Sequence, residues 1–278
     1  MSKTTAIKQR SDSIGKIKKI AHAMEVIALT RLKKSQKKTL DTRFYFDEIR
    51  RLVFDIADKI NIKIHPFFVQ RKARSVGAII ISSDKGLCGG FNNNVIERVR
   101  KLCEEKKDLK TLIIALGRKG YNYFVNRDYE IFDYVFNLAK EDIDEEIDVV
   151  SDNIIRAFLE HKIDEVYLVF NYFKLQLLGE AKFFRLLPIT YEKRKGPIRD
   201  YIYEPAAESI FDKLLNEYVK CQITHAVKES KTAEEMARMI AMKQASDSAD
   251  ELINTLLLKY HKERRKVITR ELIDVVTA

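Results

Sequence analysis

The sequence predicts an α/β protein in which long N- and C-terminal helices form an antiparallel coiled coil and carry a separate α/β domain between them. Three observations favour this fold class. Residues 206–278 contain neither glycine nor proline, and residues 4–60 contain no proline and the single glycine Gly15. Glycine and proline destabilise a helix interior by about 1 and 3 kcal/mol. Between these two stretches, short apolar runs alternate with helical segments.

The C-terminal stretch predicts one long helix or two collinear ones. At 1.5 Å per residue, such a helix reaches on the order of 100 Å. Its apolar residues recur at steps of three and four as a narrow seam, and a narrow seam needs a partner helix. The seam consists of Ile210, Leu214, Tyr218, Met236, Ile240, Leu252, Leu256, Tyr260 and Val267.

The N-terminal stretch predicts the partner helix, over 4–60. Apolar residues keep heptad spacing at Ile14, Ile17, Ala21, Met24 and Ala28, and resume it at Ile49, Leu52, Ile56 and Ile60. Two such seams, one at each end of the chain, predict an antiparallel pair. The alternative is two separate amphipathic helices packed onto one globular core, although these helices exceed the usual globular length.

The middle of the chain predicts a Rossmann-like α/β domain of about 120 residues, because strands and helices alternate. Strands are expected at 76–82, 111–116, 129–135, 165–171 and 181–189. Helices are expected from about 95 to 103 and over 145–161, and a polar return loop over 193–200. The predicted boundaries are therefore 1–70 for the N-terminal helix, 71–199 for the α/β domain and 200–278 for the C-terminal helix.

Composition is ordinary for a soluble protein, with 46% apolar and 33% charged residues. No apolar run reaches the length of a membrane span, and the N-terminal residues resemble neither a secretory signal nor a transit peptide. The three cysteines, Cys88, Cys103 and Cys221, have neither disulfide nor zinc spacing, so we expect a reducing compartment.

The net charge of +10 is concentrated at both ends of the chain. Residues 1–43 hold twelve Lys or Arg and three acidic residues, and residues 259–270 hold six Lys or Arg and one Glu. A rod with these basic zones predicts acidic surroundings: nucleic acid, an anionic membrane surface or an acidic protein surface. Charge alone leaves the three open.

No active site is predicted. The glycine-rich DKGLCGG at 84–90 fits neither phosphate-binding spacing, so a tight turn is expected, and Cys88 has no nearby base in the sequence. GRKG at 117–120 is expected to be a turn after a strand. The five histidines are scattered without ligand spacing. We therefore predict no catalytic residue, no cofactor and no metal.

Several segments resemble the gamma subunit of F-type ATP synthases of the bacterial type. They are IKKIAHAMEVIALTRLKKSQ at 17–36, ISSDKGLCGGFNNNV at 81–95, DYIYEPAAESIFDKLL at 200–215, ARMIAMKQASDSADELI at 237–253 and YHKERRKVITRELIDVV at 260–276. They follow the family's order over nearly the whole chain, and the middle, about 97–199, matches by pattern more than by motif.

The resemblance implies a central rotor shaft whose terminal helices turn inside a ring of three alpha and three beta subunits. The α/β domain would lie beside the epsilon subunit and the membrane rotor ring. ATP would be made on beta, so this chain would be a non-catalytic subunit that transmits torque. The implied location is peripheral, on the cytoplasmic face of the bacterial inner membrane, with no direct membrane insertion, no cofactor and no nucleic acid.

The resemblance also implies contact residues for the beta subunits. Met24, with Lys19, Arg31 and Lys33, matches the region that faces an acidic lever loop of beta. Higher on the shaft, the matching positions are Arg264, Arg265, Ile268 and Thr269. His261 and Arg265 stand where the family usually has Asn and Gln, and Lys266 replaces a small residue.

Two other functions remain as alternatives. The first is a basic coiled-coil protein that binds nucleic acid, which has the cations for phosphate contacts but no recognisable reading module. The second is a nucleotide-binding α/β enzyme. A calorimetric titration with ATP and NAD distinguishes this enzyme from a rotor shaft, because the shaft is expected to bind neither ligand.

Overall fold

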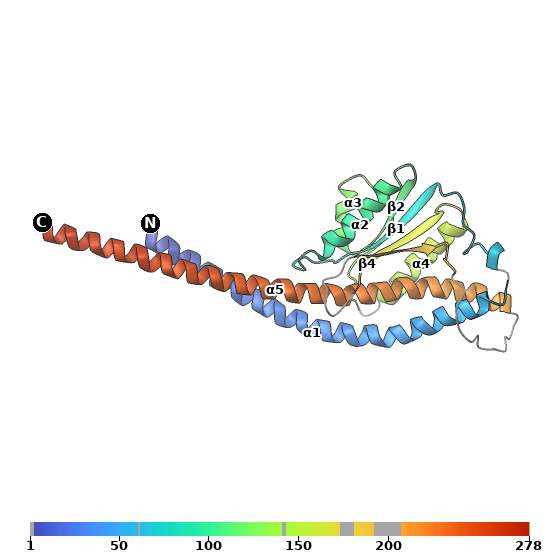
Figure 1. The fold of residues 1–278 in the computed structure, drawn as a ribbon, viewed down its shortest axis with the longest axis horizontal. Coiled ribbons are helices and arrows are strands. Elements are labelled where there is room, and N and C mark those ends of the chain that lie inside the picture. The colour runs from blue at the N-terminus through green and yellow to red at the C-terminus, as the bar shows by residue number, and fades with distance from the viewer. Residues whose placement is uncertain (1–2, 61, 141–142, 173–180, 192–206, 278) are drawn as a thin grey trace. The chain divides into compact units, whose positions relative to one another are not determined.

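The computed structural model describes residues 3–60, 62–140, 143–172, 181–191 and 207–277 (Figure 1). The predicted loop at 193–200 lies outside these residues. The chain forms two compact units. Met1–Arg31 and Arg238–Ala278 make up one, called here the coiled-coil unit, and Leu32–Ala237 makes up the other, called the α/β unit.

The two long terminal helices are confirmed. Helix α1 covers Lys3–Ala57 and has 55 residues, whereas α5 covers Ala207–Thr277 and has 71 residues. Gly15 lies inside α1 without interrupting it. The C-terminal stretch is thus one helix and not two, as expected where neither glycine nor proline interrupts the hydrogen-bonded ladder.

The α/β unit contains a five-stranded sheet in the order β3-β2-β1-β4-β5. The strands are β1 Ser75–Ile81, β2 Lys110–Leu116, β3 Ile131–Val135, β4 Glu165–Asn171 and β5 Ala181–Leu187. Four of them are parallel, and β5 pairs antiparallel with β4 at one edge. All five predicted strands are present. Strand β1 is buried at every residue, as its continuous apolar run indicated.

Helices cover both faces of the sheet (Figure 1). Helices α2, Phe91–Glu105, and α3, Arg118–Val125, pack with one face, and α4, Ile143–Leu159, packs with the other. The expected turn at 117–120 is wrong in part, because α3 begins directly after Gly117. Gly117 has φ 103°, and a Cβ there would lie 2.1 Å from the Ser82 carbonyl oxygen. The glycine therefore permits a sharp turn from strand into helix.

Both long helices also contribute to the core of the α/β unit. Val53 on α1 and Leu215 and Ile223 on α5 are fully buried in the same apolar cluster as Ile79 and Leu168 of the sheet. The narrow seam is therefore a wrong prediction over residues 215–237, where most positions of α5 are buried or half-buried. The helix is covered from several sides here, so its burial is broader than a coiled-coil seam. In this unit the two long helices pack against each other, as at Thr39 and Thr232, whose hydroxyls lie 3.0 Å apart, and also onto the globular core.

In the coiled-coil unit, most of the predicted seam is correct: Ile14, Ala21, Met24, Ala28, Ile240, Leu256 and Tyr260 are buried or half-buried. Ala21 and Ala28 are buried, but Ile17 and Leu252 are 59% and 53% exposed. One residue further on, the Lys18 Nζ lies 2.6 Å from the Asp250 carboxylate. The heptad positions Ile14, Ala21 and Ala28 are thus covered, whereas Ile17, three residues after Ile14, lies outside the seam.

Candidate partner-binding surface

The turn at 84–90 is held by its own polar network. Asn92, in the first turn of α2, accepts the Ser83 backbone N–H at 2.9 Å and donates its amide to the Ser83 hydroxyl at 2.8 Å. Gly89 has φ 57° and Leu87 has φ 64°, both left-handed. Glycine at 89 matches the expectation of a turn that needs glycine, whereas Leu87 adopts the same conformation at a steric cost.

Cys88 is a packing residue of that turn. Its side chain is 2% exposed and clusters with Phe91 and with Ala233 and Ala237 of α5. The Asn92 amide donates to its sulfur at 3.3 Å. The Asn92 amide and the Ser83 hydroxyl, which lies 3.7 Å from the sulfur, are not bases that would activate a thiol. This surrounding favours the structural role expected for Cys88.

The histidines remain separate in the described structure. His65 Nε2 lies 2.9 Å from Asp212, His22 Nδ1 lies 3.2 Å from Glu25, and His225 stacks on Phe46. Over the described parts of the chain, no three side chains of the His, Cys, Asp or Glu type come together as a metal site would require.

The predicted contact residues of α1 are accessible, but they do not form one face. Lys19, Arg31 and Lys33 are exposed and Met24 is half-buried. Met24 and Arg31 are seven residues apart, so they lie within about 20° of each other around the helix. Lys19 lies about 120° away from Arg31, and Lys33 belongs to the α/β unit. Met24 and Arg31 are therefore the pair that the helix brings together.

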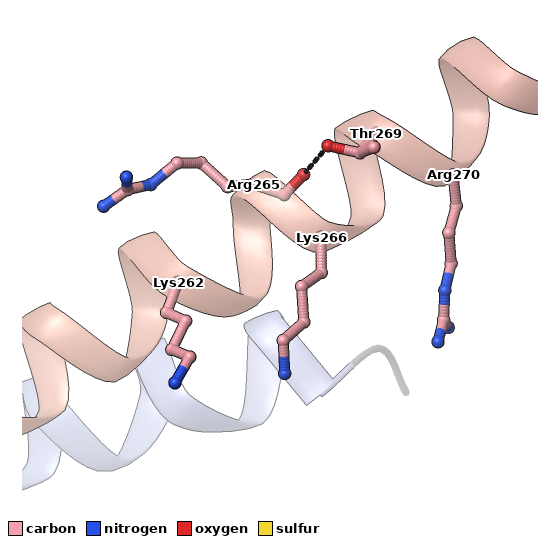
Figure 2. A pocket seen from close by; sticks show the side chains of 5 residues that line it. All are labelled: Lys262, Arg265, Lys266, Thr269 and Arg270. Atoms are coloured by element: carbon pink, nitrogen blue, oxygen red, sulfur yellow. Dashed lines mark hydrogen bonds between the residues drawn. The ribbon is translucent and has the colours of Figure 1, made fainter.

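The predicted contact residues of α5 are all exposed. Arg265 and Thr269 are one turn apart and line a shallow groove with Lys262, Lys266 and Arg270 (Figure 2). The Thr269 hydroxyl donates to the Arg265 carbonyl at 2.9 Å. Arg264 and Ile268 do not line this groove.

The structure adds a feature that the sequence analysis missed, namely exposed apolar side chains on both helices of the coiled-coil unit. On α1, Ile17, Ile20 and Ile27 follow the same three- and four-residue spacing as Met24 and Arg31. On α5, the exposed group is Leu252, Leu257, Leu258, Val267, Ile268, Leu272, Ile273, Val275 and Val276. The sequence analysis assigned Ile17, Leu252 and Val267 to the seam. The other residues of this group lie outside the predicted seam, and their apolar character was the signal available in the sequence. Extended exposed apolar surface of this kind marks an interaction site.

The apolar residues are not arranged as a membrane span. Among the helices as far as they are described, none combines the length and the hydropathy that crossing a bilayer requires.

Comparison with known proteins decides what kind of chain this is. A sequence model of the ATP synthase family matches residues 3–278. The ATP synthase gamma chain of Halothermothrix orenii is 36% identical over 97% of this chain and 96% of the relative. That of Fusobacterium nucleatum is 32% identical, also over 97% of this chain and 96% of the relative. The chain belongs to the ATP synthase gamma chain family.

Solved structures agree with this family at the level of the fold. A chain from the rotor of the Euglena gracilis mitochondrial ATP synthase matches with a TM-score of 0.63 at 18% identity, covering 95% of this chain and 99% of that chain. A chain from the central stalk and c-ring structure of the Tetrahymena thermophila enzyme has a TM-score of 0.62 at 20% identity, covering 82% and 99%. The fold of this gamma chain family member is thus that of an ATP synthase central stalk. Nothing in these comparisons supports the nucleic-acid-binding alternative.

Proposed function

We propose that this chain is the central-stalk rotor subunit of an F-type ATP synthase. It transmits torque between ion flow through the membrane rotor ring and the catalytic beta subunits, and carries no active site itself. The observation that carries the proposal is membership of the ATP synthase gamma chain family over the whole described shaft, and the apolar surface of the coiled-coil unit agrees with it. Because apolar area is stabilised by removal from water, a rod with this surface is suited to being enclosed by other subunits.

The mechanism follows from asymmetry. Two helices with different side chains present a different surface at each angle to a ring of three equivalent catalytic sites. A rotor that contacts each site differently shifts the equilibrium of that site between conformations, and it does so only by the difference in contact free energy. Turning the rotor therefore changes the nucleotide affinities of the three sites in sequence.

The proposed contacts with beta are those named above. Met24 and Arg31, on their shared face, would meet the acidic lever, with Lys19 and Lys33 on the same helix. Nearer the C-terminal end of α5, the beta subunits would contact Arg264, Arg265, Ile268 and Thr269. All four side chains are exposed, which supports this contact.

Two further parts of the proposal concern organisation and place. The functional boundaries are residues 1–70 and 200–278 for the shaft and 71–199 for the domain that meets epsilon and the rotor ring. The complex is peripheral, on the cytoplasmic face of a bacterial inner membrane. Helix α1 ends at Ala57 and α5 begins at Ala207, inside the proposed shaft ranges, and no described helix is long and apolar enough to cross a membrane.

Co-purification tests the function. A tagged form of this chain, isolated from its own cells in mild detergent, is expected to bring alpha, beta and epsilon subunits with it. Isolated tagged chain is expected to show no ATP hydrolysis, whereas the complex hydrolyses ATP. Recovery of nucleic acid without these subunits would contradict the proposal.

A further inference from the structure

Two lysines of α5 form ion pairs with two aspartates of α4, a helix of the α/β domain. The Lys220 Nζ lies 2.8 Å from Asp152 Oδ1 and 2.9 Å from Asp152 Oδ2. The Lys228 Nζ lies 3.0 Å from Asp144 Oδ2. The two lysine side chains are 21% and 22% exposed, so both are mostly covered by protein. We call these two contacts the α4–α5 ion pairs.

The α4–α5 ion pairs have the same spacing on both helices. Asp144 and Asp152 are eight residues apart, and so are Lys220 and Lys228. Eight residues rise about 12 Å along a helix and return to within about 80° of the starting direction. Because Asp152 pairs with the first lysine and Asp144 with the second, α4 and α5 run antiparallel. The ion pairs therefore join the two helices at two points along one shared side.

Lys220 interacts with more than one carboxylate. The hydrogen bond to Asp152 raises the pKa of Lys220, and the charges of Asp148 and Glu217 act in the same direction. Burial raises the pKa of Asp148, and the positive charge of Lys220 opposes this rise, whereas Glu217 adds to it. Asp148 belongs to α4 and Glu217 to α5. Without Lys220, the repulsion between carboxylates of the two helices would lose the cation that offsets it.

Apolar packing joins the same two helices. Ile147 and Ile154 of α4 are buried in the same apolar cluster as Leu215 and Ile223 of α5. The burial of apolar surface is favourable without regard to direction, so it chiefly opposes separation of the helices. A charge-assisted hydrogen bond also depends on a particular distance and angle. The α4–α5 ion pairs therefore add a directional restraint to the packing.

We propose that the α4–α5 ion pairs transmit torque between the α/β domain and the shaft, with Lys220 and Lys228 as positioning residues. The inference rests on the proposed function, in which the domain meets the rotor ring and the shaft contacts the catalytic subunits. A torque about the shaft axis pushes α4 sideways across α5. Two restraints about 12 Å apart oppose this displacement and also the pivoting of α4 about either pair. The domain and the shaft therefore turn together.

The experiment compares variants of this chain assembled in its own ATP synthase. The cation variant, Lys220→Met with Lys228→Met, removes both ammonium groups and keeps an unbranched side chain that can pack in their place. The carboxylate variant, Asp144→Asn with Asp152→Asn, removes the opposite charges of the same pairs. The conservative variant, Lys220→Arg with Lys228→Arg, keeps a cation that can bond each aspartate. Circular dichroism checks that each variant keeps the helical content of the wild type.

The matched control is Lys140→Met with Lys162→Met, which removes the same number of cations beside α4. The Lys140 Nζ lies 2.6 Å from Glu146 of α4, and the Lys162 Nζ lies 2.7 Å from Glu160, the residue after the end of α4. Neither of these ion pairs joins α4 to α5. The control therefore loses charge and ion pairs without losing the proposed connection.

The measured quantity is the angular spread of the α/β domain in single complexes. The catalytic ring is fixed to a surface, and a bead is attached through Lys107→Cys, at an exposed site of the α/β unit. Without nucleotide the rotor is stalled, and the thermal variance of the bead angle is inversely proportional to the torsional stiffness between ring and bead. Hydrogen exchange of the α4 amides in the same complexes reports how often α4 separates from its neighbours.

The cation and carboxylate variants are expected to widen the angular distribution and to exchange their α4 amides about fivefold faster than the wild type. The conservative variant and the control are expected to match the wild type in both measurements. An unchanged angular width in the cation and carboxylate variants, or equal widening in the control, would overturn the inference and leave the proposed function in place. A wild-type bead that does not rotate when ATP is added would overturn the proposed function as well.

Discussion

The imidazole of His225 on α5 stacks on the phenyl ring of Phe46 on α1, with ring centroids 4.5 Å apart and planes 11° from parallel. The stack joins the two long helices within the α/β unit. Burial of the imidazole, helped by the positive charge of Arg43, lowers the pKa of His225 to about 4. Asp47 raises this pKa and Lys182 and Lys228 lower it, each more weakly. The stack therefore contains a neutral imidazole at neutral pH.

The first prediction is that His225 makes the protein less stable in acid. In the unfolded chain its pKa is about 6.5, so the unfolded state takes up a proton first as the pH falls. The free energy of unfolding is expected to drop between about pH 6.5 and pH 4, by on the order of 2–3 kcal/mol from this group. His225→Phe keeps an aromatic stack without a titrating group. Urea unfolding at pH 7.5 and pH 4.5 should show a smaller pH-dependent loss in that variant; an equal loss would contradict the assignment.

The second prediction concerns Gly117, where a left-handed backbone meets a close approach. Gly117→Ala places a Cβ 2.1 Å from the Ser82 carbonyl oxygen at a φ of 103°. We expect the free energy of unfolding to fall by about 3 kcal/mol or more, measured by chemical denaturation. Gly86→Ala is the matched control, because nothing lies within 4 Å of a Cβ there. The control should change stability by less than about 0.5 kcal/mol. Similar values for the two variants would show that the turn tolerates a side chain.

The third prediction tests whether the Cys88 thiol has a structural role or a catalytic one. Cys88→Ser introduces a hydroxyl beside Phe91 and Ala233, where the Asn92 amide can still donate to it. We expect a loss of stability of about 1 kcal/mol and unchanged ATP hydrolysis in the assembled complex. Hydrolysis that disappears from an intact complex would require abandoning the structural role.

The fourth prediction places a charge at Met24, between the exposed Ile20 and Ile27 on one stripe of α1. Met24→Lys is expected to leave folding and assembly intact, because the position is half-buried and a lysine can reach water. A lysine facing an acidic lever forms a charge pair of less than about 1 kcal/mol if exposed, and more if partly desolvated. Such a pair lowers the free energy of one rotational position of the shaft relative to the others.

The measurement for Met24→Lys is the ratio of ion pumping to ATP hydrolysis in membrane vesicles at one ATP concentration. We expect this ratio to fall. Thr30→Lys adds the same charge at an exposed site about 120° away around α1 and should leave the ratio near the wild-type value. A ratio that stays unchanged in Met24→Lys would mean that Met24 does not face the lever.

The sequence by itself determined the elements of this protein and their approximate bounds. Long stretches free of glycine and proline predicted α1 and α5, and apolar runs predicted all five strands, because these signals depend on the local backbone and on burial of single residues. The sequence did not predict helix α3, because Gly117 and Gly120 give the start of this helix the composition of a loop. Family motifs, which are spread along the chain, indicated the family without the structure.

Only the tertiary structure decided which faces of the long helices are covered. Periodicity shows that a helix has an apolar side, but the partner that covers it comes from elsewhere in the chain. Leu215 and Ile223 are therefore buried in a core shared with the sheet, while Ile17 and Leu252 remain exposed although they suit a seam.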